Sequence, residues 1–437
     1  MTGKSIMKRS HQALNWCLLA LSFAAVVLLV SYLFRGNFRL KEMVDALLAD
    51  GELTCLADLA RPPLLPADNA ETYLRLAHAD IQAILADVDA AYNSLPKAEK
   101  EAFDEWRPMP SMLAAMHAAI KAHPDALARV EEASLCPDDD PEVDFKSGTE
   151  SADFVPAMGN WRSACRFTNC QALVQLDDGQ TEDALQTCLA MFRLSRLIDR
   201  NPTLVNHLVC HAIDGETARV ASVVLRAGPL SPASHAALEQ ELASFDMPER
   251  FRHAVRTERA HSVELFRELS AGTTPNASWL PGFKNSQCDY LDGMAECIRG
   301  AALPYSDWKR MNGAIMSRPA GDLAKSMLES VHGVRDADVR LLAQFRALRV
   351  LNALLAREEA GAADDPTLAD LELPADATTD PFNERPLQLK KLPTGWLIYS
   401  VGQNLTDDGG DLANHRDVGV GPPKAASSEA SEEAPAP

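Results

Sequence analysis

Two histidines have the residue type and spacing of metal ligands. His207 and His211 are four residues apart in a segment that is predicted to be helical, so both imidazoles share one helix face. Imidazole nitrogens bind Zn²⁺, and Cys210 or Glu216 would supply a third ligand. Alternatively, the two histidines are polar positions at a seam between packed helices. Two ligands without a defined third favour that alternative.

A second group of titratable side chains consists of His253, Glu258 and His261. They lie in a predicted helix that is crowded with Arg and Glu. We interpret them as part of a solvated stripe of i,i+4 pairs rather than as a general acid–base group. The sequence also lacks HExxH, GxSxG, a Walker loop and a strand-GxGxxG-helix unit. It therefore identifies neither catalytic nor cofactor-binding residues, and a non-enzymatic function is favoured.

The acidic run after Cys136 invites a calcium interpretation. An EF-hand loop needs Gly at its sixth position and Glu at its twelfth. If Asp139 takes the first position, Glu150 fits the twelfth, but Asp144 occupies the sixth. We therefore predict a solvated acidic loop.

Helical periodicity dominates the chain that would position these residues. Apolar side chains recur at three- and four-residue steps, which predicts amphipathic helices. Trp161–Leu176, a polar turn over 177–180 and a helix through Ile198 resemble a tetratricopeptide-type helical hairpin. In such an antiparallel hairpin Cys170 lies nearly opposite Cys188, where a disulfide is one option.

The end of the chain has a different character. Helices are predicted near 319–332 and, most clearly, over Asp336–Glu359. Two β-rich runs around Pro393-Thr394-Gly395 then predict a β-hairpin. The final residues are rich in Pro, Ala, Ser and Glu, a composition typical of disorder.

We predict a mainly α fold: one N-terminal transmembrane helix, an antiparallel array of helical hairpins, and a small C-terminal β-hairpin. The expected segments are a basic tail (1–13), the transmembrane helix (14–34), an N-terminal helical region (40–135), an acidic loop (136–159), a central helical array (160–361), the β-hairpin with an Asp/Gly loop (366–417) and a disordered tail (418–437).

Leu14–Phe34 contains no charged side chain. As a helix it is roughly 31 Å long, enough to cross a bilayer core. It exceeds the usual length of a signal-peptide core, and Trp16 and Tyr32 lie near its ends, where interfacial aromatic residues belong. A short basic tail before the span and a long body after it are typical of a signal anchor. We therefore expect a single-pass protein of the cell (inner, cytoplasmic) membrane, with its N-terminus cytoplasmic and its body extracytoplasmic.

Composition limits the partners. The formal net charge is -20, and an acidic body repels phosphate backbones, so we expect no nucleic-acid partner. A hydrophobic content of 46% argues against a disordered chain. Apart from Cys17, eight cysteines remain; the even number suits an oxidising compartment, although most fit buried reduced thiols.

The segment from Asp380 to Asp411 resembles the C-terminal segment of type II secretion pseudopilins. The matching residues are Asp380, Pro381, Pro386, Tyr399, Ser400, Gly402, Gly409 and Gly410. This resemblance implies a Ca²⁺ site with Asp407, Asp408 and Asp411 as oxygen ligands. The chain departs from the family because no prepilin cleavage signal precedes its span. The alternative is a structural cap on the last helix, with a water-exposed aspartate turn.

The chain also resembles a family of uncharacterised bacterial membrane-anchored helical proteins. The resemblance rests on the order of four features: the anchor, the run "PPLLPADNAETYLRLA", a helical middle and the motif DPF…YSVG…DDGG. That resemblance implies no activity. We expect the exported body to serve as an interaction or scaffold module for protein partners. The alternatives are an envelope hydrolase with a non-local active site, and an accessory component of a secretion or pilus-like machine.

Overall fold

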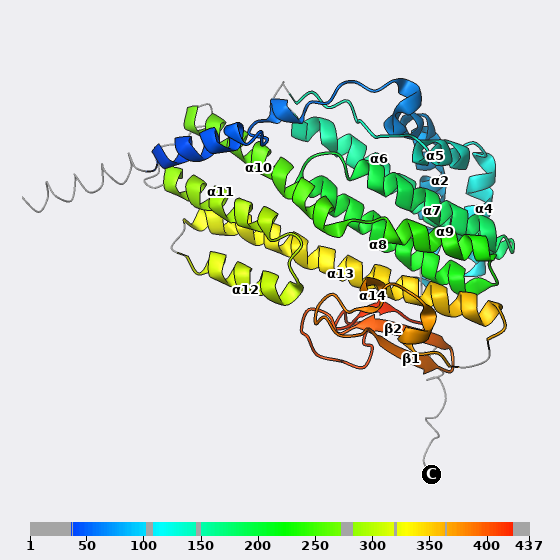
Figure 1. Cartoon of the computed structure of the whole chain (residues 1–437). Coiled ribbons are helices and arrows are strands. Elements are labelled where there is room, and N and C mark those ends of the chain that lie inside the picture. Colours follow the sequence, from blue (N-terminus) through cyan, green and yellow to red (C-terminus); the bar gives the residue numbers. More distant parts are fainter. Residues whose placement is uncertain are drawn as a thin grey trace, which may run out of the picture.

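The computed structural model describes residues 36, 38–101, 108–145, 150–271, 283–318, 321–362 and 365–422. These residues are mainly helical and carry a small antiparallel sheet near the C-terminus, as predicted (Figure 1). The expected transmembrane helix Leu14–Phe34 lies outside the described residues. Within the described ranges, no helix has both the length and the apolar character needed to cross a membrane.

A helix over 38–49 precedes the helices of the body. They are α2 (Ala70–Ser94), α3 (Lys97–Glu101), α4 (Pro110–Ala122), α5 (Ala126–Ser134), α6 (Glu150–Asp177), α7 (Thr181–Ile198), α8 (Leu204–Ala227), α9 (Pro232–Ala243), α10 (Met247–Ala271), α11 (Phe283–Arg299), α12 (Tyr305–Met316), α13 (Asp322–Glu359) and α14 (Ala375–Thr378).

The long helix α13 is the centre of this arrangement. It packs against α8, α9, α10 and α11, and the sheet lies against it on another side (Figure 1). The sequence predicted two helices here, near 319–332 and over Asp336–Glu359. They are one helix, because Val331, Val334 and Val339, which lie before, within and after the predicted break, are buried in the same apolar cluster. That burial outweighs the cost of about 1 kcal/mol for an internal glycine at Gly333.

Apolar side chains form three buried clusters. The first lies mainly among α2, α4, α5 and α6, and the second joins α7, α8 and α9 to α13 and the sheet. The third lies among α10, α11, α12 and α13, and residues of the 38–49 helix pack on it. Helix α6 begins at Glu150, inside the segment expected to be a loop, because Ala157 and Trp161 lie one turn apart on its buried face.

Seven of the described cysteines are free thiols: Cys55, Cys136, Cys165, Cys188, Cys210, Cys288 and Cys297. Cys170 packs on the first cluster, whereas Cys188 belongs to the second, so this pair forms no disulfide. Burial raises the pKa of the Cys188 thiol to about 12. This thiol therefore acts as a small apolar side chain.

Strands β1 (Gln388–Leu392) and β2 (Gly395–Ser400) form the predicted hairpin. A third strand, β3 (Val418–Val420), pairs antiparallel with β2. The assignment of 418–420 to a disordered tail was therefore wrong. Both valines of β3 are buried beneath the helices, and this burial holds a strand too short to be recognised from its own sequence.

Asp380 ties the start of this unit to the end of β2. Its carboxylate accepts hydrogen bonds from the backbone N–H of Phe382 at 2.8 Å, from the Ser400 hydroxyl at 2.8 Å and from the backbone N–H of Val401 at 2.9 Å. The side chain is buried, and its negative charge is thus offset by three donors. The Asp-Pro-Phe and Tyr-Ser-Val-Gly elements accordingly have a structural role.

Gly402 and Gly409 provide a matched test of that role, because both have positive φ, of 70° and 82°. A Cβ at Gly402 would lie 2.2 Å from the carbonyl oxygen of Arg416, whereas one at Gly409 would meet nothing within 4 Å. We expect Gly402→Ala to lower the free energy of unfolding by about 2 kcal/mol more than Gly409→Ala. Urea unfolding of both variants checks this, and equal losses would contradict it.

Candidate functional site

Asp407 and Asp408 lie in the loop between β2 and β3. One carboxylate oxygen of Asp407 accepts hydrogen bonds from the Tyr399 hydroxyl at 2.8 Å and from the backbone N–H of Gly409 at 2.9 Å. The Asp408 carboxylate accepts one from the Asn404 side-chain amide at 2.7 Å. Both carboxylates therefore accept hydrogen bonds from donors in the loop or on the adjoining strand β2.

The third proposed calcium ligand, Asp411, accepts hydrogen bonds from the Asn414 amide at 2.9 and 3.1 Å. The loop is organised around Asp417, which is buried and accepts from the backbone N–H groups of Gly410 and Asp411 at 2.7 and 3.0 Å. Asp407, Asp408 and Asp411 do not form a convergent group of three ligand atoms within the described residues. Calcium binding by these aspartates stays a prediction.

One convergent set of potential metal ligands occurs within the described residues. It consists of His207, His211 and Asp338, which we call the His–Asp centre. Asp338 Oδ1 lies 2.9 Å from His207 Nε2 and 2.5 Å from His211 Nε2, and all three side chains are buried. The two histidines share a face of α8, as predicted. The third member comes from α13, whereas Cys210 and Glu216 do not join the set.

A chain of buried charges extends from the His–Asp centre. His207 Nδ1 donates to Asp199 at 2.8 Å, Arg250 Nε lies 2.5 Å from the other oxygen of Asp199, and Arg250 Nη2 lies 2.8 Å from Asp214. The Arg250 guanidinium also stacks on the Phe245 ring, 5.0 Å from its centroid. Each carboxylate of the chain is thereby paired with a cation.

The charge states follow from this pairing. Burial opposes ionisation of Asp199, but Arg250 and His207 lower its pKa to about 2. Burial opposes protonation of His207, but Asp199 and Asp338 raise its pKa to about 10. Without a metal ion, His207 is therefore an imidazolium held between two carboxylates.

The connection between α7 and α8 positions His207. Thr203 caps α8: its hydroxyl accepts from the backbone N–H of Asn206 at 3.2 Å, and its own N–H donates to the Thr257 hydroxyl at 3.0 Å. The Asn206 amide donates to the carbonyl oxygens of Ile198 and Asn201 at 2.9 and 3.0 Å. These bonds fix where α7 ends and α8 begins, and with them the distance from Asp199 to His207.

His253, Glu258 and His261 do not converge into an acid–base group. His253 Nε2 lies 3.0 Å from the carbonyl oxygen of Arg200, and Glu258 accepts from the backbone N–H of Leu204 at 3.1 Å. His261 is half-buried on the same helix. The expected solvated stripe was wrong for His253 and Glu258, because both support the segment that leads into α8. Burial lowers the pKa of His253.

A second buried polar group was not recognised in the sequence. Asp139, expected in a solvated loop, is fully buried. It accepts a hydrogen bond from the Asn201 amide at 2.6 Å, and Arg61 donates to the carbonyl oxygens of both Asp139 and the Asn201 side chain at 2.6 Å. Burial and the nearby charge of Glu71 raise the pKa of Asp139 to about 7. Asp139 differs from its less buried acidic neighbours only through its long-range interactions with Arg61, Glu71 and Asn201, which the local sequence does not reveal.

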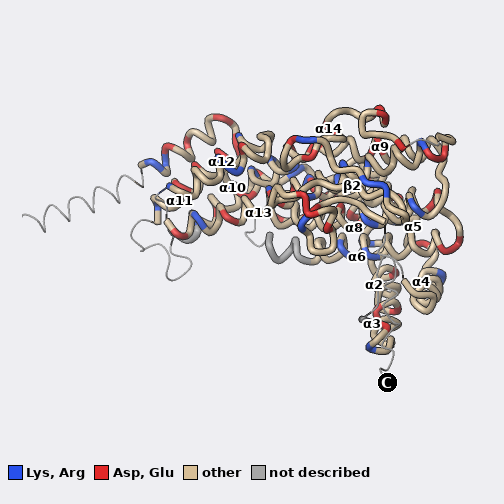
Figure 2. The backbone as a smooth tube through the Cα atoms, turned by 90° about the horizontal axis from the view of Figure 1, so that it is seen from below, with Lys and Arg blue, Asp and Glu red and all other residues tan. Residues whose placement is uncertain are grey.

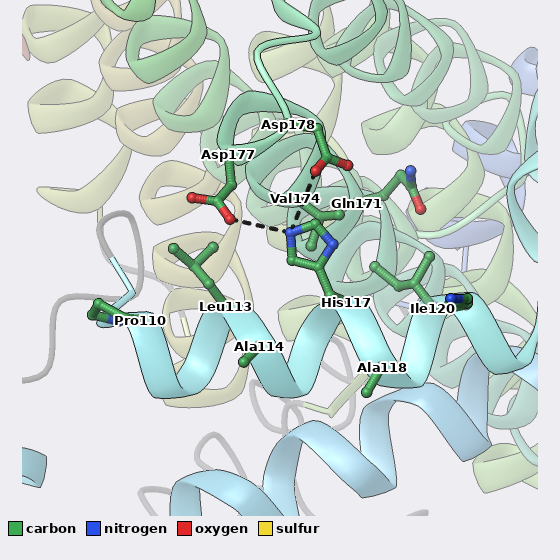
Figure 3. Close-up of a pocket in the computed structure, with 11 residues that line it drawn as sticks. Pro110, Leu113, Ala114, His117, Ala118, Ile120, Gln171, Val174, Asp177 and Asp178 are labelled. Carbon is green, nitrogen blue, oxygen red and sulfur yellow. Dashed lines mark hydrogen bonds and ion pairs between the residues drawn. The ribbon is translucent and has the colours of Figure 1, made fainter.

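A groove of about 800 Å³ lies between α4 and the C-terminal end of α6 (Figure 3). Leu113, Ala114 and Val174 contribute its apolar lining. Between Leu113 and Ile120, the His117 ring points toward two carboxylates, with Nε2 3.2 Å from Asp177 and 3.8 Å from Asp178 (Figure 3).

The groove and the His–Asp centre are separate. None of the eleven groove-lining residues belongs to that centre, and none carries a hydroxyl or a thiol that could act as a nucleophile. The groove carboxylates are about half exposed, at 49% and 51%. The arrangement thus offers apolar side chains beside water-facing carboxylates, which is the combination that orients a bound ligand.

Comparison of the chain with protein-family models, with curated proteins and with solved structures finds no match.

Proposed function

We propose that this protein is a membrane-anchored scaffold whose exported helical body binds a protein partner in the groove between α4 and α6. The groove itself carries the proposal, because its lining combines apolar side chains with a pair of carboxylates. This surface fits an amphipathic helix that presents an apolar face and a Lys or Arg. The basic side chain would meet Asp177 and Asp178, and the apolar face would cover Leu113 and Val174.

Charge supports a protein partner over a nucleic acid. Lys and Arg are interspersed with Asp and Glu along the helices (Figure 2), and the chain carries a net charge of -20. A nucleic acid needs a continuous basic surface. A partner that adds positive charge at the groove is therefore the better match.

We further propose that Leu14–Phe34 is the anchor and that the body is extracytoplasmic. The helix over 38–49 follows that stretch closely, and Leu40, Met43 and Val44 pack on the third apolar cluster. Arg39 also pairs with Asp292 on α11. An anchor attached through this helix would hold the body at a fixed orientation to the membrane, as a scaffold requires.

Site-specific photo-crosslinking of the full chain, in cells that produce it, tests the function. A crosslinking side chain replaces Ala114, an exposed residue that lines the groove, or Ala128, an exposed alanine on α5 outside it. We expect one exported protein to be captured from position 114 and not from 128. The double change Asp177→Lys and Asp178→Lys is expected to reduce capture at least tenfold, since it places like charges opposite each other.

Two results would contradict the proposal. Equal capture from both alanines would mean that the groove does not select a partner. Capture of a cytoplasmic protein, with the same dependence on the two aspartates, would contradict the extracytoplasmic body while leaving the groove as a binding site.

A further inference from the structure

We infer that the His–Asp centre binds one divalent transition-metal ion of borderline softness, such as Zn²⁺, and that this ion joins α8 to α13. Two imidazole nitrogens and one carboxylate oxygen are the ligand types that such ions prefer. The ligand atoms of His207, His211 and Asp338 lie within 4.8 Å of one another, and no other site in the described ranges brings three together.

The distances suit a small ion. Zn²⁺ lies at about 2.0–2.2 Å from nitrogen and oxygen ligands, so tetrahedral ligands are about 3.4 Å apart. Asp338 Oδ1 is now 2.9 Å from one imidazole nitrogen and 2.5 Å from the other. A retreat of the Asp338 carboxylate by less than about 1 Å would bring its two distances to the imidazole nitrogens to that value.

Two buried ligand atoms also lack a satisfactory partner. His211 Nε2 and Asp338 Oδ2 make no hydrogen bond within the described residues. The imidazole touches the other carboxylate oxygen, and Arg335 Nη1 lies 4.0 Å from Oδ2, beyond hydrogen-bond distance. Leaving such polar atoms unpaired in the interior is costly. A metal ion would engage the imidazole nitrogen and leave the second carboxylate oxygen to complete the coordination.

The surroundings orient the ligands as in known metal sites. Metal-binding histidines commonly donate their other N–H to a carboxylate, which fixes the ring. Asp199 accepts that bond from His207 at 2.8 Å, and Arg250 holds Asp199 in turn. In the metal-free protein a proton on His207 takes the place of the ion. Direct measurement of the metal content therefore distinguishes the metal-free state from the metal-bound state.

The test uses the full chain, purified in detergent with an affinity tag that contains no histidine. Elemental analysis by mass spectrometry is expected to find about one Zn²⁺ per chain. After removal of the metal with EDTA, Zn²⁺ is titrated back against a chromophoric chelator. We expect His211→Gln to weaken binding at least tenfold and Asp199→Asn to weaken it 10- to 100-fold.

The matched control is His235→Gln. His235 is also buried between helices, but its ring nitrogens contact Asn352 and Glu359 at 2.7 and 2.9 Å, away from the centre. This variant should bind Zn²⁺ as the wild type does. Circular dichroism checks that each variant folds. If His211→Gln does not fold, the visible spectrum of Co²⁺ added to the metal-free wild type takes the place of that variant. We expect this spectrum to show ligand-field bands and no thiolate charge-transfer band.

Three outcomes would overturn the inference. One is a wild type that takes up no Zn²⁺ at micromolar free metal, which would leave a proton-only network. Another is equal binding by wild type and His211→Gln. The third is a thiolate charge-transfer band with Co²⁺, which would place the metal on a cysteine instead.

Discussion

Replacing Arg250 with Ala is expected to lower the free energy of unfolding by about 3–5 kcal/mol. The Arg250 side chain is 10% exposed and pairs with Asp199 and Asp214, which are 3% and 0% exposed. Removal of the guanidinium leaves Asp214 without a cation and Asp199 with His207 alone, and the interior cannot replace the lost charge with water. The loss should therefore far exceed that of an ordinary surface ion pair.

Arg252→Ala is the matched control on the same helix. Arg252 pairs with Glu249 one turn away, and the two side chains are 27% and 52% exposed. Solvent screens that pair, so its loss should cost less than about 1 kcal/mol. Urea unfolding of the full chain in detergent compares the two variants.

A second substitution separates charge from packing. Asp214→Asn added to Arg250→Ala removes the carboxylate that loses its cation, so it should recover part of the lost stability. If the double variant is no more stable than Arg250→Ala alone, the effect of Arg250 comes from its contact with Phe245 and not from its charge.

Asp139→Asn is expected to stabilise the protein above neutral pH. Burial and Glu71 raise the pKa of Asp139 from 3.8 to about 7 in the folded chain. Between those two values the folded state holds a proton that the unfolded state has lost. Raising the pH through this window therefore favours unfolding, by up to about 4 kcal/mol over the whole window.

An asparagine resembles the protonated carboxyl and does not titrate. Its side-chain carbonyl can still accept the hydrogen bond from Asn201 that Asp139 accepts at 2.6 Å. The stability difference between Asp139→Asn and wild type should therefore grow from pH 4 to pH 8. Urea unfolding at several pH values measures it, with the exposed Asp125→Asn as a control that should show little growth. A difference independent of pH would mean that Asp139 is already ionised when buried.

Local patterns in the sequence determined much of the fold. The three- and four-residue spacing of apolar side chains predicted the helices, and the turn at Pro393-Thr394-Gly395 predicted the hairpin of β1 and β2. These elements are set by interactions over a few residues, which a sequence displays directly. The same spacing placed His207 and His211 on one helix face, as the structure has them.

Longer-range packing decided what local patterns could not. Strand β3 exists because β2 and α13 bury its two valines, and α13 continues through Gly333 because its neighbours bury both halves. Asp139 belongs to an acidic run, yet contacts from residues far away in the chain enclose it. In each case the free energy of burial, which depends on the neighbours, outweighs the preference of the residue itself.

The candidate metal centre shows the same division most clearly. The sequence by itself determined two ligands, because four residues make one turn of a helix. The third, Asp338, lies 131 positions from His207. Nothing in the local sequence of α13 marks this aspartate, since its position beside α8 depends on how two long helices pack. Only the tertiary structure supplies that contact, and with it the difference between a pair of histidines and a site.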